Sequence, residues 1–405
     1  MQRVRVSSHQ VPVHKLGDSQ MTLSPKFRLA AKQSDLLDPS LELELWQRGE
    51  PLIPGLPDDV ALNCLLRIPV DNHMTCRVVC KRWYLLFGTK DRFFCRRKEL
   101  GFHDPWFFVF SFHKSTGKIQ WNVFDLNNFA WHTIPAMPCK EKVCPDGFGC
   151  IAFPHEGVLY VCGGVASDVD CPLNSVVKYE VRRNRWTVMT KMITARSFFA
   201  SGVIDGMIYV VGGNSTDLFE LNSAEVLDPN RGIWRSVSNM GTKMAAYDSA
   251  VLNGKLLVTE GWFWPFYVFP RGQIYDPQTD NWENMASGLR EGWTGSSVVL
   301  YGRLFVVSEH ERTKLKVYDS ETDSWDTVEG HPLPEQICKP FSVDCCDNRI
   351  VVVGRNLHVA VGHIKSLQQK NTSSKRCSFA VCWQVVEAPE SLSDFTPSSA
   401  QVLFA

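Results

Sequence analysis

The sequence lacks both a long apolar run and an excess of charge of either sign. Its longest apolar stretches, near Trp106–Phe112 and Trp262–Phe269, span about seven to nine residues, whereas a membrane-spanning helix needs roughly 18. Lysine and arginine together number 43, and aspartate and glutamate also number 43, so the formal net charge of the 405 residues is zero. These absences argue against a membrane protein and against a general binder of nucleic acid.

The 14 cysteines lack the sequence features of a secreted or a zinc-binding protein. Residues 1–15 are polar and basic and contain no apolar signal-peptide core, so we expect reduced thiols. No Cys-x-x-Cys pair occurs, and the group Cys139, Cys144 and Cys150 lacks the spacing of a structural zinc site. We therefore expect no metal and no cofactor, and a location in the cytoplasm, the nucleus or both.

Sequence motifs of catalysis are also missing. We find no nucleophile elbow, no Gly-rich phosphate loop and no His-x-x-x-His pair. The run Glu309-His310-Glu311 contains residue types that bind metals or transfer protons, but its place between two expected strands favours a solvated turn. We therefore expect no catalytic residue.

What is present divides the chain into three regions. Residues 1–50 have few aromatic residues and little periodicity, which predicts a disordered segment. Residues 51–101 carry the signals of short helices, because Pro57 fits a first helical turn and Pro69 ends the apolar run that follows it. Further helices are expected over Met74–Trp83 and Asp91–Leu100. The core of so small a module is thin, so the module needs a partner or a neighbouring domain.

Three motifs in residues 51–101 resemble an F-box. They are Leu56-Pro57-Asp58-Asp59-Val60, the Leu-x-x-Ile-Pro pattern at Leu65–Pro69, and the Cys-Arg-Val-Val-Cys-Lys-Arg-Trp run at Cys76–Trp83. The residues by themselves also fit a generic helical hairpin. The resemblance implies binding to a Skp-type adaptor and, through it, to a cullin–RING ligase. It assigns the adaptor contacts to Leu56, Pro57, Val60, Leu65, Pro69, Cys80, Lys81 and Trp83.

Residues 102–405 repeat with a period of about 48 residues. A strand-like apolar segment begins at Gly157, Gly206, Gly254, Gly302 and Asn348. A second strand-like segment then leads to a tryptophan, and with the weaker flanking copies the tryptophans are Trp131, Trp186, Trp234, Trp282, Trp325 and Trp383. Each period holds about four short strands that cannot bury both faces alone, so neighbouring units must stack.

This pattern resembles the kelch repeat, in which each unit is one blade of a β-propeller. The double glycine of the repeat is present at Gly163-Gly164 and Gly212-Gly213, whereas the later units depart from it. The six tryptophans predict six blades. The expected fold class is therefore mainly β, a six-bladed kelch-type β-propeller in residues 102–405, preceded by a small all-α F-box domain in residues 51–101.

The first blade has only three strands of its own, over Trp106–Phe112, Ile119–Leu126 and Ala130–Ile134. The apolar tail Ala400–Ala405 has no later partner, so we expect it to supply the missing strand and close the ring. Closure removes the exposed sheet edges that invite aggregation.

Long loops after the second and fourth strands of each blade gather at one end of the predicted propeller. Their aromatic and cationic residues fit a protein interface. The Trp262–Phe269 cluster also fits packing over its own blade. In kelch repeats an arginine at the place that Arg196 occupies is often structural. A polar insertion over residues 365–378 leaves the opposite end. The candidate target-binding residues are Arg196, Trp262, Phe263, Trp264, Arg271, Arg290, Trp293 and Lys339.

Together the two patterns resemble a plant-type F-box/kelch-repeat protein. The resemblance implies a non-catalytic substrate-recognition subunit of a Skp–cullin–F-box ubiquitin ligase, whose propeller binds the protein targeted for ubiquitination and degradation. It does not identify that target. Two alternatives stay open, an adaptor-independent interaction scaffold and a propeller enzyme with a vestigial F-box. Adaptor binding tests the first alternative, and bound metal or turnover of a small molecule would favour the second.

Overall fold

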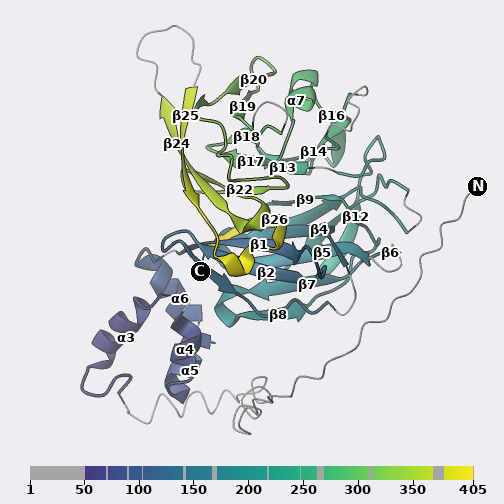
Figure 1. Cartoon of the computed structure of the whole chain (residues 1–405). Helices are drawn as coiled ribbons and strands as arrows, with labels where there is room; N and C mark the ends of the chain where they lie inside the picture. The colour runs from purple at the N-terminus through teal and green to yellow at the C-terminus, as the bar shows by residue number, and fades with distance from the viewer. Residues whose placement is uncertain are drawn as a thin grey trace, which may run out of the picture.

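The computed structural model shows a ring of β-sheets with a group of four helices attached at its outside (Figure 1). The predicted disordered segment 1–50 and residues 368–377 of the predicted insertion lie outside the residues that the structure describes. The described residues are 51–69, 72–88, 91–102, 104–139, 143–166, 171–216, 219–246, 248–261, 269–309, 313–367 and 378–404. None of the helices in these ranges is long and apolar enough to cross a lipid bilayer.

The helical module begins where the sequence predicts it. Pro57 directly precedes the first helix, and Asp58 and Asp59 occupy its first turn, where negative charge is favourable. The expected second helix is two helices, because the backbone N–H groups of Val78 and Val79 bond to carbonyls three residues back and end the first one. The four helices are α3 (Asp58–Leu66), α4 (His73–Arg77), α5 (Lys81–Gly88) and α6 (Asp91–Glu99).

The module has a small core of its own. Trp83 packs against this core, and its indole Nε1 donates a hydrogen bond to the Leu52 carbonyl at 2.8 Å. The buried side chains of this apolar cluster are Leu65, Leu66, Cys76, Leu86, Phe87 and Phe93. So few buried residues give little stability, as expected for a module that needs a neighbour.

In the described residues, six blades of four antiparallel strands each form the propeller, which confirms the predicted number of blades. Blades 1 to 6 are β26-β1-β2-β3 (Phe395–Phe404, Pro105–His113, Ile119–Asp125, Ala130–Thr133), β4-β5-β7-β8 (Val143–Phe153, Val158–Ala166, Val176–Glu180, Arg185–Val188), β9-β10-β11-β12 (Ala200–Ile204, Met207–Val211, Ala224–Asp228, Ile233–Val237), β13-β14-β15-β16 (Asp248–Leu252, Lys255–Thr259, Gly272–Asp276, Asn281–Asn284), β17-β18-β19-β20 (Ser297–Leu300, Arg303–Val307, Leu315–Asp319, Ser324–Thr327) and β22-β23-β24-β25 (Ser342–Cys346, Arg349–Val353, Val359–Leu367, Ser378–Val386). Short strands β6 (Cys171–Pro172) and β21 (Glu329–Gly330) extend blades 2 and 6.

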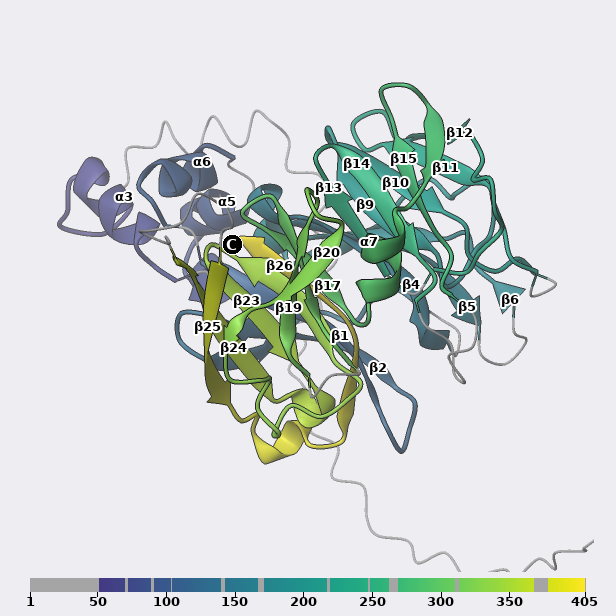
Figure 2. The same cartoon turned by 90° about the horizontal axis from the view of Figure 1, so that it is seen from above.

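The innermost strands make a closed ring through their contacts, and Figure 2 shows the same blades from above. Each innermost strand, from β4 round to β22, contacts the next one, and β26 contacts both β4 and β22. β26 pairs with β1 from Pro105↔Phe404 to His113↔Phe395. It is longer than the expected tail strand, because it begins at Phe395. A strand from the end of the described chain therefore completes the first blade.

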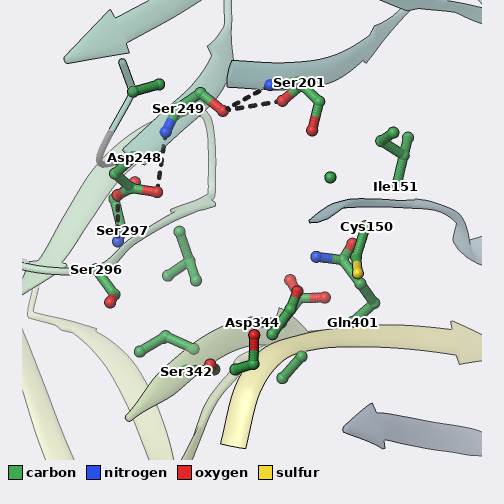
Figure 3. Close-up of a pocket in the computed structure, with 18 of the residues that line it drawn as sticks. Cys150, Ile151, Ser201, Asp248, Ser249, Ser296, Ser297, Ser342, Asp344 and Gln401 are labelled. Carbon is green, nitrogen blue, oxygen red and sulfur yellow. Dashed lines mark hydrogen bonds between the residues drawn. The ribbon is translucent and has the colours of Figure 1, made fainter. Parts of the chain in front are cut away.

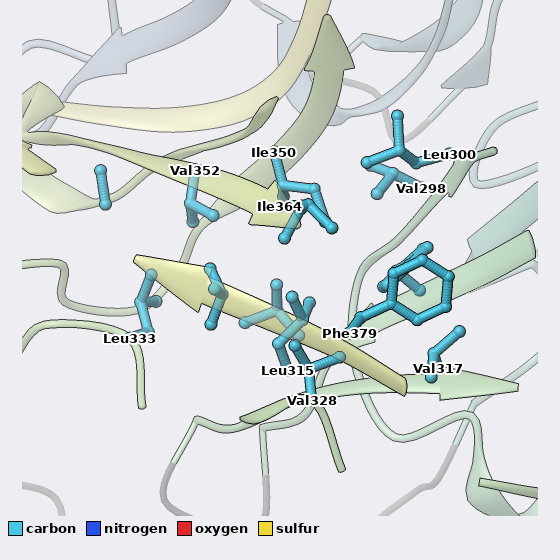
Figure 4. Close-up of a cluster of buried hydrophobic side chains, with 14 of the residues drawn as sticks. Val298, Leu300, Leu315, Val317, Val328, Leu333, Ile350, Val352, Ile364 and Phe379 are labelled. Carbon is cyan, nitrogen blue, oxygen red and sulfur yellow. The ribbon is translucent and has the colours of Figure 1, made fainter. Parts of the chain in front are cut away.

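Apolar side chains fill the space between neighbouring blades. Between blades 5 and 6, for example, Leu315 and Val317 form one cluster with Ile350, Val352 and Phe379 (Figure 4). Each strand points alternate side chains to its two faces, so an interior strand contributes to the cores on both sides. The blades are therefore stabilised mainly by one another.

The recurring tryptophan links each blade to the one before it. In five blades its indole Nε1 donates to a backbone carbonyl in the connection that precedes the blade. The pairs are Trp186–Pro135 (2.8 Å), Trp234–Thr190 (3.0 Å), Trp282–Ser238 (2.7 Å), Trp325–Gly288 (3.0 Å) and Trp383–His331 (3.1 Å). Trp131 of blade 1 has the same place in the repeat, but its Nε1 bonds to none of the described residues.

Candidate protein-interaction surfaces

The helical module exposes apolar side chains that its small core leaves outside. Val78 and Val79, in the turn between α4 and α5, are 81% and 60% exposed. Leu56 and Val60, before and within α3, are also exposed. Exposed large apolar side chains beside one another mark interaction sites. We call the exposed residues Leu56, Pro57, Val60, Val78, Val79, Cys80 and Lys81 the adaptor surface.

The structure separates the predicted adaptor contacts into two groups. The exposed ones are Leu56, Pro57, Val60, Pro69, Cys80 and Lys81. Leu65 is only 1% exposed, so its assignment as an adaptor contact is wrong, because α3 turns this side chain into the core of the module. Trp83 is half-buried and anchors the segment before α3. Val78 and Val79 were not among the predicted contacts, because apolar residues within one continuous helix are expected to face the core.

Asp58 stabilises the start of α3. Its carboxylate accepts hydrogen bonds from the backbone N–H of Leu52 at 2.7 Å and from the Arg82 guanidinium at 3.1 Å. These two groups lower the pKa of Asp58 below its ordinary value, with the Leu52 N–H as the larger cause. This carboxylate therefore supports the fold of the helix terminus.

The connections after the second and fourth strands of each blade lie at one end of the propeller, which we call the loop face. The helical module attaches at the other end. The chain enters β1 where Pro105 pairs with Phe404, at the beginning of the second strand of its blade. Arg77 of α4 donates to the carbonyl of Arg182 in η3 (Val181–Arg183), the turn between the third and fourth strands of blade 2. The loop face is therefore clear of the helical module.

Two of the predicted target-binding residues are buried, so these assignments are wrong. Arg196 is 0% exposed and pairs with Glu225 at 2.7 Å, while its other amino group donates to the Gly212 carbonyl at 2.7 Å. Trp293 is also 0% exposed, and its indole donates to Asp248 at 3.0 Å. Both side chains bind groups of neighbouring strands and thereby hold the blades together.

Three other predicted residues lie on the loop face, where each makes an ion pair. Arg271 pairs with Glu260 and Glu220, with its amino group 3.1 Å from both Glu220 oxygens. The Lys339 ammonium lies 3.1 Å from Glu309. The pair of Arg290 with Glu291 is longer, at 3.4 Å. The predicted residues Trp262, Phe263 and Trp264 lie outside the described residues, as does His310.

The loop face also exposes apolar residues that the sequence analysis did not select. Phe219 and Phe269 are 70% and 61% exposed, and Ile193 and Phe198 are exposed as well. Phe219 and Phe269 flank the Glu220–Arg271 ion pair in sequence, which brings their two loops together. We call Ile193, Phe198, Phe219 and Phe269 the aromatic patch. A loop phenylalanine packs inward as readily as outward, so only the structure reveals this exposure.

A cavity of about 980 Å³ runs through the ring of innermost strands (Figure 3). Its walls carry many hydroxyl groups, and two carboxyl groups bridge neighbouring strands. Asp248 accepts the Ser297 N–H at 2.8 Å, and Asp344 accepts the Val402 N–H at 2.6 Å. Burial raises the pKa of each carboxyl to about 6, against the opposing effect of these hydrogen bonds. Much of the polar lining therefore connects the blades.

The described residues contain no group of three or more histidine, cysteine, aspartate and glutamate side chains that could hold a metal ion. The described cysteines are free thiols, several of them buried. Burial raises the pKa of the Cys150 thiol to about 12, so this thiol is protonated and unreactive near neutral pH.

Comparisons with known proteins agree with both parts of this architecture. The family model described as the F-box domain matches residues 53–95, and the one described as the FKB95, Kelch-repeats domain matches residues 156–381. The chain is 66% identical to the F-box/kelch-repeat protein At1g30090 of Arabidopsis thaliana, with all of both chains covered. It is 38% identical to the F-box protein AFR of the same plant, over 90% of this chain and 95% of that protein. The chain thus belongs to the F-box/kelch-repeat family of plant proteins.

Proposed function

We propose that this protein is the substrate-recognition subunit of a Skp–cullin–F-box ubiquitin ligase, acting in the cytoplasm, the nucleus or both. The observation that carries the proposal is the adaptor surface, a set of exposed apolar residues on an F-box that is attached to a closed propeller. The chain itself performs no covalent chemistry in this function. It brings a target protein close to a ubiquitin-loaded enzyme.

The adaptor surface binds the Skp-type adaptor by burying its apolar side chains. Val78 and Val79 project from a turn, so a groove on the partner can enclose both of them. Complete burial of one such side chain contributes about 1.5–3 kcal/mol. Cys80 and Lys81, also exposed, extend this surface to the start of α5. The adaptor in turn connects the chain to a cullin–RING ligase.

The loop face binds the target protein in this proposal. The aromatic patch supplies apolar anchors, and phenylalanine side chains of this kind contribute strongly to protein interfaces. Arg271 and Lys339 add charged groups at the same end of the propeller. Binding at this face raises the local concentration of target lysines near the bound ligase, which increases the rate of transfer.

Co-purification with a Skp-type adaptor tests the proposal. We expect the wild type to bind, and the Leu56→Ala/Pro57→Ala and Val78→Ser/Val79→Ser variants to lose binding while remaining folded by circular dichroism. Val188→Ser is the matched control, because Val188 is an equally exposed valine on β8 of the propeller. Absence of binding by folded wild type would remove the ligase function and favour an adaptor-independent scaffold.

A further inference from the structure

Two arginines join the helical module to the propeller. Arg97 of α6 is buried and donates to the carbonyls of Leu66 and Ile68, each at 2.7 Å, where α3 ends. Its other amino group pairs with Asp104, which directly precedes β1. Arg97 therefore fixes the point at which the chain passes from one module to the other.

Arg77 makes a second connection, to a different blade. Its guanidinium donates to the carbonyl of Phe87 through Nε at 3.2 Å and through Nη2 at 2.6 Å. The same Nη2 donates to the carbonyl of Arg182, and Nη1 lies 3.5 Å from the carbonyl of Arg183. Phe87 lies in the last turn of α5, and the other two residues end η3. Carbonyls at a helix end lack partners within the helix, so one guanidinium binds the ends of two helices.

Arg77 lies where the helical module meets blade 2. The helical module meets η3 through α5, and beside Arg77 lies a cavity of about 140 Å³ lined in part by His73, His132 and Tyr179. Burial lowers the pKa of the Arg77 guanidinium, with Tyr84 and Tyr179 opposing this shift, but an arginine stays charged at any physiological pH. The hydrogen bonds of Arg77 join the module to blade 2 at a second point, away from the Asp104 connection, so they restrict rotation of the module about that connection.

We propose that Arg77 is a positioning residue that holds the F-box in one orientation on the propeller. Its planar guanidinium presents several donors in a fixed arrangement, which is what binding three carbonyls from two modules requires. The consequence of this orientation for ubiquitin transfer rests on the proposed function. The orientation sets the distance and direction from the adaptor to the loop face, and transfer between two bound molecules is sensitive to such geometry.

The first experiment measures the orientation without any ligase. Amide hydrogen exchange and small-angle X-ray scattering compare the full chain as wild type, Arg77→Gln, Arg77→Lys and Arg96→Gln. Arg96 is a matched control, because it is an exposed arginine of the same module and pairs with Glu99, three residues along the same helix. We expect Arg77→Gln to raise exchange in residues 181–184 several-fold and to broaden the distance distribution. Arg77→Lys should give an intermediate result, and Arg96→Gln should match the wild type.

The second experiment measures the consequence in the assembled ligase. Self-ubiquitination of the adaptor-bound chain is mapped by mass spectrometry, which needs no known target. We expect a restricted set of modified lysines in the wild type and a broader set in Arg77→Gln, with adaptor binding changed less than twofold.

The outcomes separate the two proposals. If wild type does not bind the adaptor, the ligase function fails, while exchange and scattering still decide the role of Arg77. Unchanged exchange in residues 181–184 and unchanged scattering in Arg77→Gln overturn the role of Arg77, whatever the adaptor does. If Arg77→Gln unfolds the helical module, Arg77→Lys decides, because it keeps the charge beside Phe87. Raised exchange with adaptor binding retained then supports the proposal, and unchanged exchange overturns it.

Discussion

Individual polar residues of this propeller act as connections between blades. Arg196 is one example, because it lies in the connection before blade 3 and binds Glu225 within that blade. Glu225 also accepts the backbone N–H groups of Ile193 and Thr194, at 2.8 and 2.9 Å. A single carboxylate thereby holds the connection between blades 2 and 3. Such a buried pair is costly to break on one side only, because the remaining charge stays buried.

Replacing Glu225 should therefore destabilise the fold strongly. We expect Glu225→Gln to lower the free energy of unfolding by about 3 kcal/mol, because Arg196 keeps its buried charge. Urea denaturation measures this change. Arg183→Gln removes the surface pair with Glu180 and serves as the control, with an expected loss of about 0.5 kcal/mol or less. Equal small losses in both variants would contradict the structural role of Arg196.

Asp248 should make stability depend on pH. Its carboxyl has a pKa of about 6 in the folded protein, above its ordinary value of 3.8, so folding favours the protonated form. This contribution is complete below pH about 4 and is lost as the pH rises through about 6. We expect the wild type to lose up to about 3 kcal/mol relative to Asp248→Asn between pH 4 and pH 7. Parallel pH profiles of the two proteins in urea denaturation would show that this carboxyl is not buried.

At the scale of elements, the strands were predictable and the exposure of particular side chains was not. The strands could be predicted because a tryptophan and an apolar segment recur in each blade. The tryptophan recurs because it has a structural role, as in Trp234, whose indole binds the connection before its blade. The break between α4 and α5 has no such signal, so Val78 and Val79 could not be recognised as exposed. Trp293 is a typical interface residue by type, but its burial depends on Asp248, 45 positions away.

The tryptophans of the repeat should differ in their energetic importance. The indole Nε1 of Trp234 donates to the Thr190 carbonyl, whereas the Nε1 of Trp131 has no hydrogen-bond partner among the described residues. We expect Trp234→Phe to lower the free energy of unfolding by about 1 kcal/mol more than Trp131→Phe, which is the usual contribution of one hydrogen bond. Thermal and urea denaturation of the two variants provide the comparison. A larger loss at position 131 would contradict the assigned hydrogen bonds.

β26 should be essential for the propeller as a whole. Deletion of residues 398–405 removes the buried side chains of Ala400, Val402 and Leu403 and exposes the edge of β1. The apolar loss alone is several kcal/mol, which is of the order of the whole stability of a protein. We expect the thermal midpoint to fall by about 10 °C or more. Gln401→Ala is the control, because Gln401 lies in the same strand but lines the cavity. An unchanged midpoint in the truncated protein would contradict the closure of the ring by β26.

At the scale of the whole molecule, the two surfaces lie at opposite ends of the propeller. The adaptor surface is on a module held at the η3 end, and the aromatic patch is on the loop face. Sequence patterns predicted the helical module and the repeating blades. They could not show that Arg77 fixes the relation between the two, because its partners in the propeller are backbone carbonyls more than 100 positions away, which carry no side-chain signature.

This separation predicts that the two ends bind independently. Adaptor binding should protect residues 56–60 and 78–81 from hydrogen exchange and leave residues 193–198 and 269–271 unchanged. The reason is that closely packed clusters of apolar side chains join the blades between them. Hydrogen exchange with and without a Skp-type adaptor makes the measurement, with Leu56→Ala/Pro57→Ala as the unbound control. Protection on the loop face would reveal communication across the propeller.

The pairing of β26 with β1 also has a consequence for synthesis on the ribosome. β1 emerges early, whereas its inner partner β26 is made after the strands of the other five blades. Until β26 is made, the growing chain therefore carries a first blade with an open hydrogen-bonding edge, which favours aggregation. A chain that stops before β26 keeps that edge open. Synthesis of β26 is thus the step that allows the ring to form.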